Sequence, residues 1–137
     1  MGATISIVKA KKTVLIITDD SVLTVKMAAG IKTALKGNKV SVKTASEFGG
    51  SDLLPAEVFF LGCEKPNTDS FAYIEDLLKH INLAGRFCGV FSPGSVKAAR
   101  YLAGLVKDCE AALNPEHLTD PAVNAGKWAK KVVSGKF

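Results

Sequence analysis

Residues 13–35, TVLIITDDSVLTVKMAAGIKTAL, decide the fold, because they contain a strand, a turn and a helix in succession. Thr13–Ile17 is an unbroken aliphatic and β-branched run, which is typical of a strand covered on both faces. The polar run Thr18–Ser21 follows directly and supplies the start signal of a helix. One face of that helix is formed by residues at helical spacing: Thr24, Ala28, Ile31 and Leu35. Gly37-Asn38 then predicts the end of the helix.

Two further units of strand, loop and helix follow this one. Val58–Leu61 is an apolar strand, and the polar loop Gly62–Ser70 leads from it into a helix. Arg86–Phe91 is the next strand, and the loop Ser92–Ser95 leads from it into another helix. This alternation predicts a doubly wound α/β fold, with a parallel sheet and helices on both faces.

The remaining segments predict the order of the strands. Lys39–Thr44 alternates valines with polar residues, which indicates a half-exposed strand at the edge of the sheet. The weak run Ala111–Leu113 and the capped start Thr119–Pro121 predict a fifth strand and a last helix. We therefore expect a three-layer, five-stranded parallel sheet in the order 2-1-3-4-5. Residues 11–137 would form a single domain, and residues 1–10 a leader or an extra edge strand.

The composition is typical of a soluble globular protein, with 47% hydrophobic and 23% charged residues among 137. No apolar run approaches the roughly 20 residues of a membrane span, and the start lacks the apolar core of a signal peptide. We therefore expect a cytoplasmic protein without a membrane partner. The net charge of +5 arises from eighteen basic and thirteen acidic residues scattered along the chain. We interpret these scattered charges as a solvated basic surface, and we expect no nucleic-acid partner.

The sequence contains no recognisable catalytic or metal-binding motif. Cys63, Cys88 and Cys109 form no CxxC pair, and we expect them to be reduced thiols. Neither histidine has a neighbour at metal-ligand spacing. The motifs of serine hydrolases, nucleotide triphosphatases and zinc metalloproteases are absent, so these activities have no support.

The turn after the first strand is the predicted ligand site, because ligands bind in the crevice at the carboxyl ends of parallel strands. Ser21 and Thr24 offer hydroxyls beside the N–H groups of a helix start, which suits a phosphate. Plain helix capping by the same residues is the alternative. Asp19 and Asp20 would repel a phosphate about 4–6 Å away. Val22 stands where a glycine would let the backbone approach a ligand.

These segments resemble the flavodoxin-like family. VLIIT, the hydroxyl-rich turn and TVKMAAGIKTAL are similar to its first strand, FMN-phosphate loop and first helix. VFFLGCEKPN is similar to its third strand and second flavin loop, and YIEDLLKHINLAGRFCGVFSPGS to the following helix, strand and third loop. The resemblance covers Lys11 to Val133 and implies bound FMN, electron transfer to a redox partner protein and no catalytic residues of its own. The implied cofactor-binding residues are Asp19, Asp20, Ser21, Val22, Thr24, Cys63, Ser92, Pro93 and Gly94.

The sequence departs from the family pattern inside the predicted site. The family's phosphate loop, Ser/Thr-x-Thr-Gly-x-Thr, is matched here by Asp19, Ser21, Val22 and Thr24, so two of its four defining positions are kept. The two ring-contacting loops contain no aromatic residue, and the net charge is basic where flavodoxins are commonly acidic. A binding or interaction module on the same fold, without flavin, is therefore the alternative function.

The receiver domain of response regulators has the same strand order and is a further alternative. Asp19 and Asp20 resemble its acidic pair, and Pro66–Phe71 resembles its loop after the third strand. The phosphoacceptor aspartate is replaced by Gly62, and the lysine of the final strand by Asn114. The sequence thus indicates at most a degenerate receiver, for which Mg²⁺ binding by the acidic pair would be the test.

Overall fold

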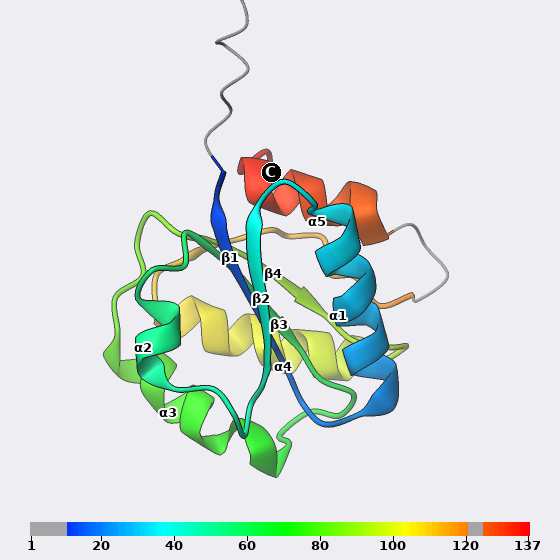
Figure 1. The fold of residues 1–137 in the computed structure, drawn as a ribbon. Coiled ribbons are helices and arrows are strands. Elements are labelled where there is room, and N and C mark those ends of the chain that lie inside the picture. Colours follow the sequence, from blue (N-terminus) through cyan, green and yellow to red (C-terminus); the bar gives the residue numbers. More distant parts are fainter. Residues whose placement is uncertain (1–10, 121–124) are drawn as a thin grey trace, which may run out of the picture.

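The computed structural model describes residues 11–120 and 125–137. A five-stranded parallel sheet lies at its centre, in the order β2-β1-β3-β4-β5 (Figure 1). The strands are β1 (Thr13–Thr18), β2 (Lys39–Thr44), β3 (Val58–Gly62), β4 (Phe87–Phe91) and β5 (Ala112–Leu113). This topology confirms the predicted fold. The predictions for residues 1–10 and for a helix start at Pro121 lie outside the described residues.

Helices cover both faces of the sheet, so the domain has three layers (Figure 1). The layer of α1 and α5 packs on one face, and the layer of α2, α3 and α4 packs on the other. Their bounds are α1 (Val22–Ala34), α2 (Gly50–Leu53), α3 (Ala72–His80), α4 (Val96–Asp108) and α5 (Ala125–Ser134), with a 3-10 turn, η2 (Asp69–Phe71), before α3. No helix in the described ranges is long and apolar enough to cross a membrane.

The residues of β1 alternate between two hydrophobic cores, because successive side chains of a strand point to opposite faces. Val14 and Ile16 belong to the core beneath α1 and α5, together with Trp128. Leu15 and Ile17 belong to the core beneath the other helices. All four β1 side chains are at least 97% buried, which explains why this strand is apolar throughout.

Strand pairing aligns the carboxyl ends of the three central strands. Thr18 of β1 pairs with Gly62 of β3, and Gly62 pairs with Phe91 of β4. The loops that follow these strands therefore leave the sheet at the same level. Among the residues that the structure describes, β2 is an edge strand that pairs with β1, and its side chains are only partly covered, as predicted.

Candidate functional site

Three loops leave the carboxyl edge of the sheet at the same level: 19–21 after β1, 63–68 after β3, and 92–95 after β4. We call the region that these loops border the crevice. Because Thr18, Gly62 and Phe91 share one register, all nine predicted site residues lie in these loops or in the first turn of α1. The fold therefore brings together residues that are up to 75 positions apart, from Asp19 to Gly94.

Ser21 is the N-cap of α1. Its Oγ accepts a hydrogen bond from the Thr24 backbone N–H at 3.4 Å, and its extended backbone (φ −64°, ψ 133°) is that of a capping residue. Ser21 therefore caps the helix, as the alternative to phosphate binding predicts. Val22 follows the cap with its side chain 81% exposed, so it adds an apolar surface at the rim of the crevice.

The Asp19 carboxylate lies inside the crevice and joins two of its loops. One oxygen accepts from the Ser21 N–H at 3.2 Å, and the other accepts from the Glu64 N–H at 2.8 Å. The Asp19 N–H in turn donates to the carbonyl of Gly62 at 3.2 Å. Asp19 is only 7% exposed, whereas Asp20 is exposed to solvent, so the two neighbouring acids have different environments.

Three buried hydroxyl groups border the crevice without a hydrogen-bond partner among the described residues. They are Oγ1 of Thr18 at the end of β1, Oγ1 of Thr24 in the first turn of α1, and Oγ of Ser92 directly after β4. An unsatisfied buried polar group costs about 1–3 kcal/mol, so such groups are expected to meet a ligand or water. Thr18 is absent from the residues predicted from sequence, although it opens the polar run that follows β1.

The Cys63 thiol is buried at the edge of this crevice, and its Sγ donates to the carbonyl of Lys65 at 3.3 Å. Burial and the neighbouring Asp19 charge raise the pKa of Cys63 to about 12. The thiol is therefore protonated at neutral pH and is a poor nucleophile.

The loop after β4 is shaped by its own backbone and by the segment before residue 120. The Gly94 N–H donates to the carbonyls of Ser92 and Thr119, both at 2.8 Å, and Gly94 has φ 85°. This left-handed conformation favours glycine. Ser95 then caps α4, because its Oγ accepts from the Ala98 N–H at 3.0 Å. Pro93 and Gly94 thus form a tight turn at the rim.

No aromatic side chain from the two ring-facing loops enters the crevice, as the sequence indicates. Three aromatic side chains of the flanking elements make contacts of their own. The Phe91 ring is fully buried and packs directly over Gly62, where an added Cβ would overlap the ring. Phe71 is also fully buried, and the Tyr101 hydroxyl donates to Glu75 at 3.1 Å between α4 and α3.

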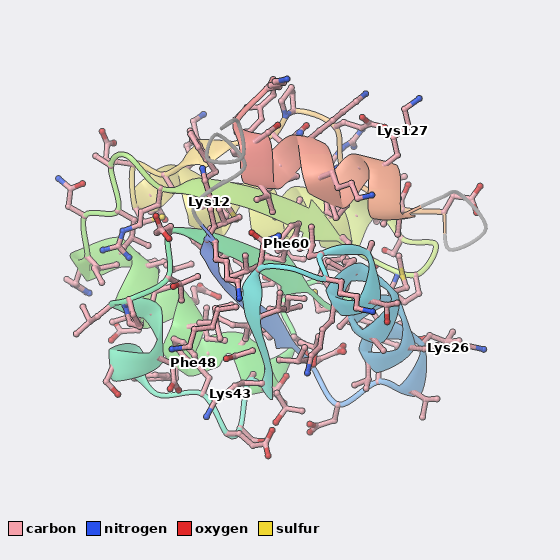
Figure 2. All side chains as sticks on the ribbon, turned by 45° about the horizontal axis from the view of Figure 1, so that its top comes forward. Lys12, Lys26, Lys43, Phe48, Phe60 and Lys127 are labelled. Atoms are coloured by element: carbon pink, nitrogen blue, oxygen red, sulfur yellow. The ribbon has the colours of Figure 1, made fainter. Side chains whose placement is uncertain are left out.

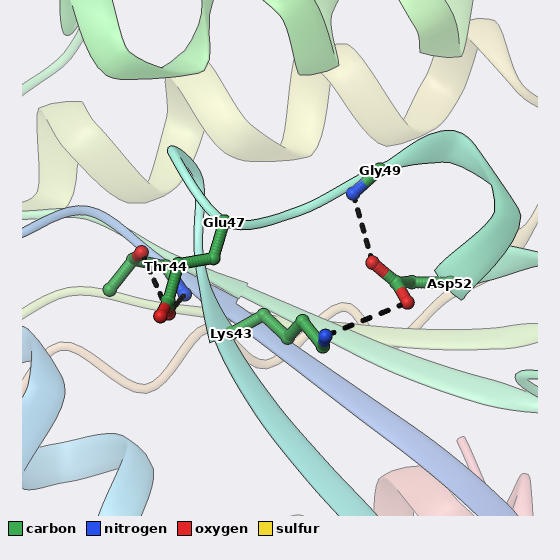
Figure 3. A network of polar contacts seen from close by, with 5 residues as sticks. All are labelled: Lys43, Thr44, Glu47, Gly49 and Asp52. Atoms are coloured by element: carbon green, nitrogen blue, oxygen red, sulfur yellow. Dashed lines mark hydrogen bonds and ion pairs between the residues drawn. The ribbon is translucent and has the colours of Figure 1, made fainter.

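Polar groups of the segment after β2 bond to one another (Figure 3). The Glu47 carboxylate accepts from the backbone N–H and the hydroxyl of Thr44, at 3.2 and 3.0 Å, and these bonds lower the pKa of Glu47. The Asp52 carboxylate accepts from the Gly49 N–H at 2.9 Å and lies 3.8 Å from the Lys43 ammonium. Within the described ranges, no three His, Cys, Asp or Glu side chains gather as metal ligands.

Comparison with known proteins agrees with this architecture. Neither a protein-family model nor a curated protein matches the sequence. Solved structures do match it. A short-chain flavodoxin associated with a non-canonical PDU bacterial microcompartment superposes with a TM-score of 0.81, at 15% identity, over 92% of this chain and 99% of that one. Flavodoxin 2 from Bacillus cereus gives 0.78 at 20% identity, over 92% and 99%.

This chain has the flavodoxin-like fold. A Fusobacterium nucleatum flavodoxin bound to flavin mononucleotide also superposes, with a TM-score of 0.70 at 15% identity, over 90% of this chain and 98% of that one. The fold is thus shared over nearly the whole length of these proteins, while four residues in five or more differ.

Proposed function

We propose that the crevice binds FMN non-covalently and that the protein carries electrons for a redox partner protein. The observation that carries this proposal is the set of unpartnered buried hydroxyls of Thr18 at the end of β1, Thr24 in the first turn of α1 and Ser92 directly after β4. Ligands of open parallel sheets bind at the carboxyl ends of the strands, where these residues lie. The Fusobacterium flavodoxin of the same fold is bound to flavin mononucleotide, which supports the choice of ligand.

The residues of the crevice fit FMN in part. The N–H groups of the first turn of α1 other than that of Thr24, which Ser21 caps, would hold the phosphate together with the Thr24 hydroxyl, at the positive end of the helix dipole. Ser92, Pro93 and Gly94 would line the ring from the other side. The bound flavin would supply the electron-transfer chemistry, and the chain would supply position and a buried environment. The protonated, neutral thiol of Cys63 would line the site.

The absorption spectrum and FMN titration of the purified chain test the proposal. FMN fluorescence should be quenched below about 100 µM ligand, which corresponds to about −5.5 kcal/mol. T24V should weaken binding, because it removes a buried hydroxyl from the phosphate site. T33V is the matched control, since Thr33 lies on the exposed face of the same helix and bonds its own backbone. A folded parent protein that does not quench FMN contradicts the proposal.

The Asp19 carboxylate favours a second candidate, a binding or interaction module without flavin. It already supplies negative charge to the N–H groups of Ser21 and Glu64, as a bound anion would. In this case the parent fails to bind FMN, and D19T combined with V22G creates binding. Tight FMN binding by the parent eliminates this candidate.

A further inference from the structure

The layer formed by α1 and α5 carries lysines and no acidic residue. Segments 22–38 and 125–137, which contain these helices and their carboxyl ends, include seven lysines and neither Asp nor Glu: Lys26, Lys32, Lys36, Lys127, Lys130, Lys131 and Lys136. The two segments are almost 90 positions apart in sequence but pack on the same face of the sheet (Figure 1). Lys26 and Lys127 project outward from α1 and α5 (Figure 2). The fold therefore gathers charges that are scattered along the chain.

These lysines are not neutralised by neighbours. The ion pairs of the described residues join Lys43 to Asp52, Lys79 to Glu75 and His80 to Asp76, and none involves the α1–α5 layer. Glu57 lies near the same end of the sheet as Lys12, but its carboxylate accepts from the Thr13 N–H instead. The layer thus presents its positive charge to solvent.

A surface hollow lies where the carboxyl ends of α1 and α5 meet the start of β1. Lys12, Lys36 and Lys130 border it, and Ala34 and Val133 form part of its apolar lining. Because α1 and α5 run opposite to the strands, this hollow lies at the amino edge of the sheet, away from the crevice.

Exposed apolar side chains also lie on α1 itself. Leu23 and Val25 are 52% and 39% exposed. Protein interfaces combine apolar contacts with a polar, solvent-accessible rim. Segments 22–38 and 125–137 contain no arginine, the residue that binds phosphates and guanine in bidentate fashion in nucleic-acid complexes.

We propose that the α1–α5 layer is a docking surface for an acidic protein. A glutamate or aspartate side chain of the partner would enter the hollow, with its carboxylate near Lys12, Lys36 and Lys130 and its methylene groups against Ala34 and Val133. The proposal does not depend on flavin, because the hollow and the crevice lie at opposite edges of the sheet.

The test uses a fluorescent poly-L-glutamate peptide of about 20 residues as the acidic probe, with binding followed by anisotropy in the full-length protein. K36E/K130E should raise the Kd at least about tenfold, because each change places a negative charge beside the probe's carboxylates. K97E/K107E, two exposed lysines of α4 in the opposite layer, makes the same change in net charge. It should raise the Kd less than about threefold, through the long-range field alone.

Circular dichroism and thermal melting establish that both double variants are folded. Equal losses in the two variants would overturn the proposal, because attraction would then reflect net charge rather than this layer. A DNA duplex of the same charge that binds more tightly than the peptide would also overturn it, as would preferential binding to vesicles containing anionic lipid. Peptide binding that is lost only in K36E/K130E supports the docking surface.

Discussion

The Asp19 carboxylate accepts a hydrogen bond from the Glu64 backbone N–H at 2.8 Å, across 45 positions of sequence. The other oxygen of the same carboxylate accepts from Ser21, so one buried side chain connects the loops after β1 and β3. A buried carboxylate with two backbone donors is a stable arrangement, because charge-assisted hydrogen bonds offset its loss of hydration. Substitution of Asp19 is therefore expected to change both the stability of the protein and the affinity of the crevice for anions.

Replacing Asp19 by Asn should destabilise the protein. The amide has one acceptor oxygen, so the N–H of Ser21 or Glu64 loses its partner, at a cost of about 1–3 kcal/mol. Urea denaturation measures the free energy of unfolding. D20N is the matched control, since Asp20 is exposed and its change should stay within about 0.5 kcal/mol. Equal stability of the two variants would show that the carboxylate does not hold the loops together.

Replacing Asp19 by Thr should raise FMN affinity if the proposed flavin site is correct. The change removes a buried negative charge next to the helix start and restores a hydroxyl at this loop position. We expect the Kd, measured by titration at low salt, to fall at least about tenfold, which corresponds to about 1.4 kcal/mol. D20T removes the same charge from an exposed position and should change the Kd less. A larger effect of D20T would contradict the role given to Asp19.

Substituting Gly62 by Ala should destabilise the fold, although alanine is usually tolerated in strands. An added Cβ would overlap the buried Phe91 ring, which lies on the aligned position of β4. Overpacking of this kind costs about 1–3 kcal/mol or more. G30A is the control with the opposite sign: nothing lies within 4 Å of that Cβ, and alanine in a helix gains about 0.5–1 kcal/mol over glycine. Thermal melting of both variants should therefore give shifts in opposite directions.

The Cys63 thiol should resist alkylation at pH 7 in the folded protein and react quickly after unfolding. Its pKa is raised to about 12 in the fold, from 9.0 for an unperturbed thiol, so the folded state keeps its proton over this range. Between pH 9 and 12 the unfolded state therefore binds fewer protons, and the free energy of unfolding falls as the pH rises. Mass spectrometry of iodoacetamide-treated protein, with and without urea, follows the reaction. The alkaline loss of stability should be smaller in C63A than in the parent.

Much of the fold could be predicted from sequence because its signals are local. The apolar run of β1 and the alternation of β2 each depend on which faces of a strand are covered, and both are visible in a few residues. The caps at Ser21 and Ser95 likewise bond backbone groups three positions ahead. The poor strand at 112–113 was predictable only from the repeating pattern, since its own sequence has a weak signal.

The crevice was only partly predictable. Ser21, Thr24 and Ser92 could be named because they follow strands, but the sequence does not distinguish the inward Asp19 from the outward Asp20. The packing of Phe91 over Gly62 joins two strands 29 positions apart and has no local signal.

By itself, the amino-acid sequence determined the elements, their order and the loops at which a ligand would bind, because strand and helix periodicity and capping act over short separations. Only the tertiary structure decided which groups of those loops face one another. It placed the Asp19 carboxylate against Glu64, left the hydroxyls of Thr18, Thr24 and Ser92 without partners, and gathered the lysines of α1 and α5. The physical reason is that hydrogen bonding, burial and electrostatic repulsion depend on distance in space, which strand register and helix packing set.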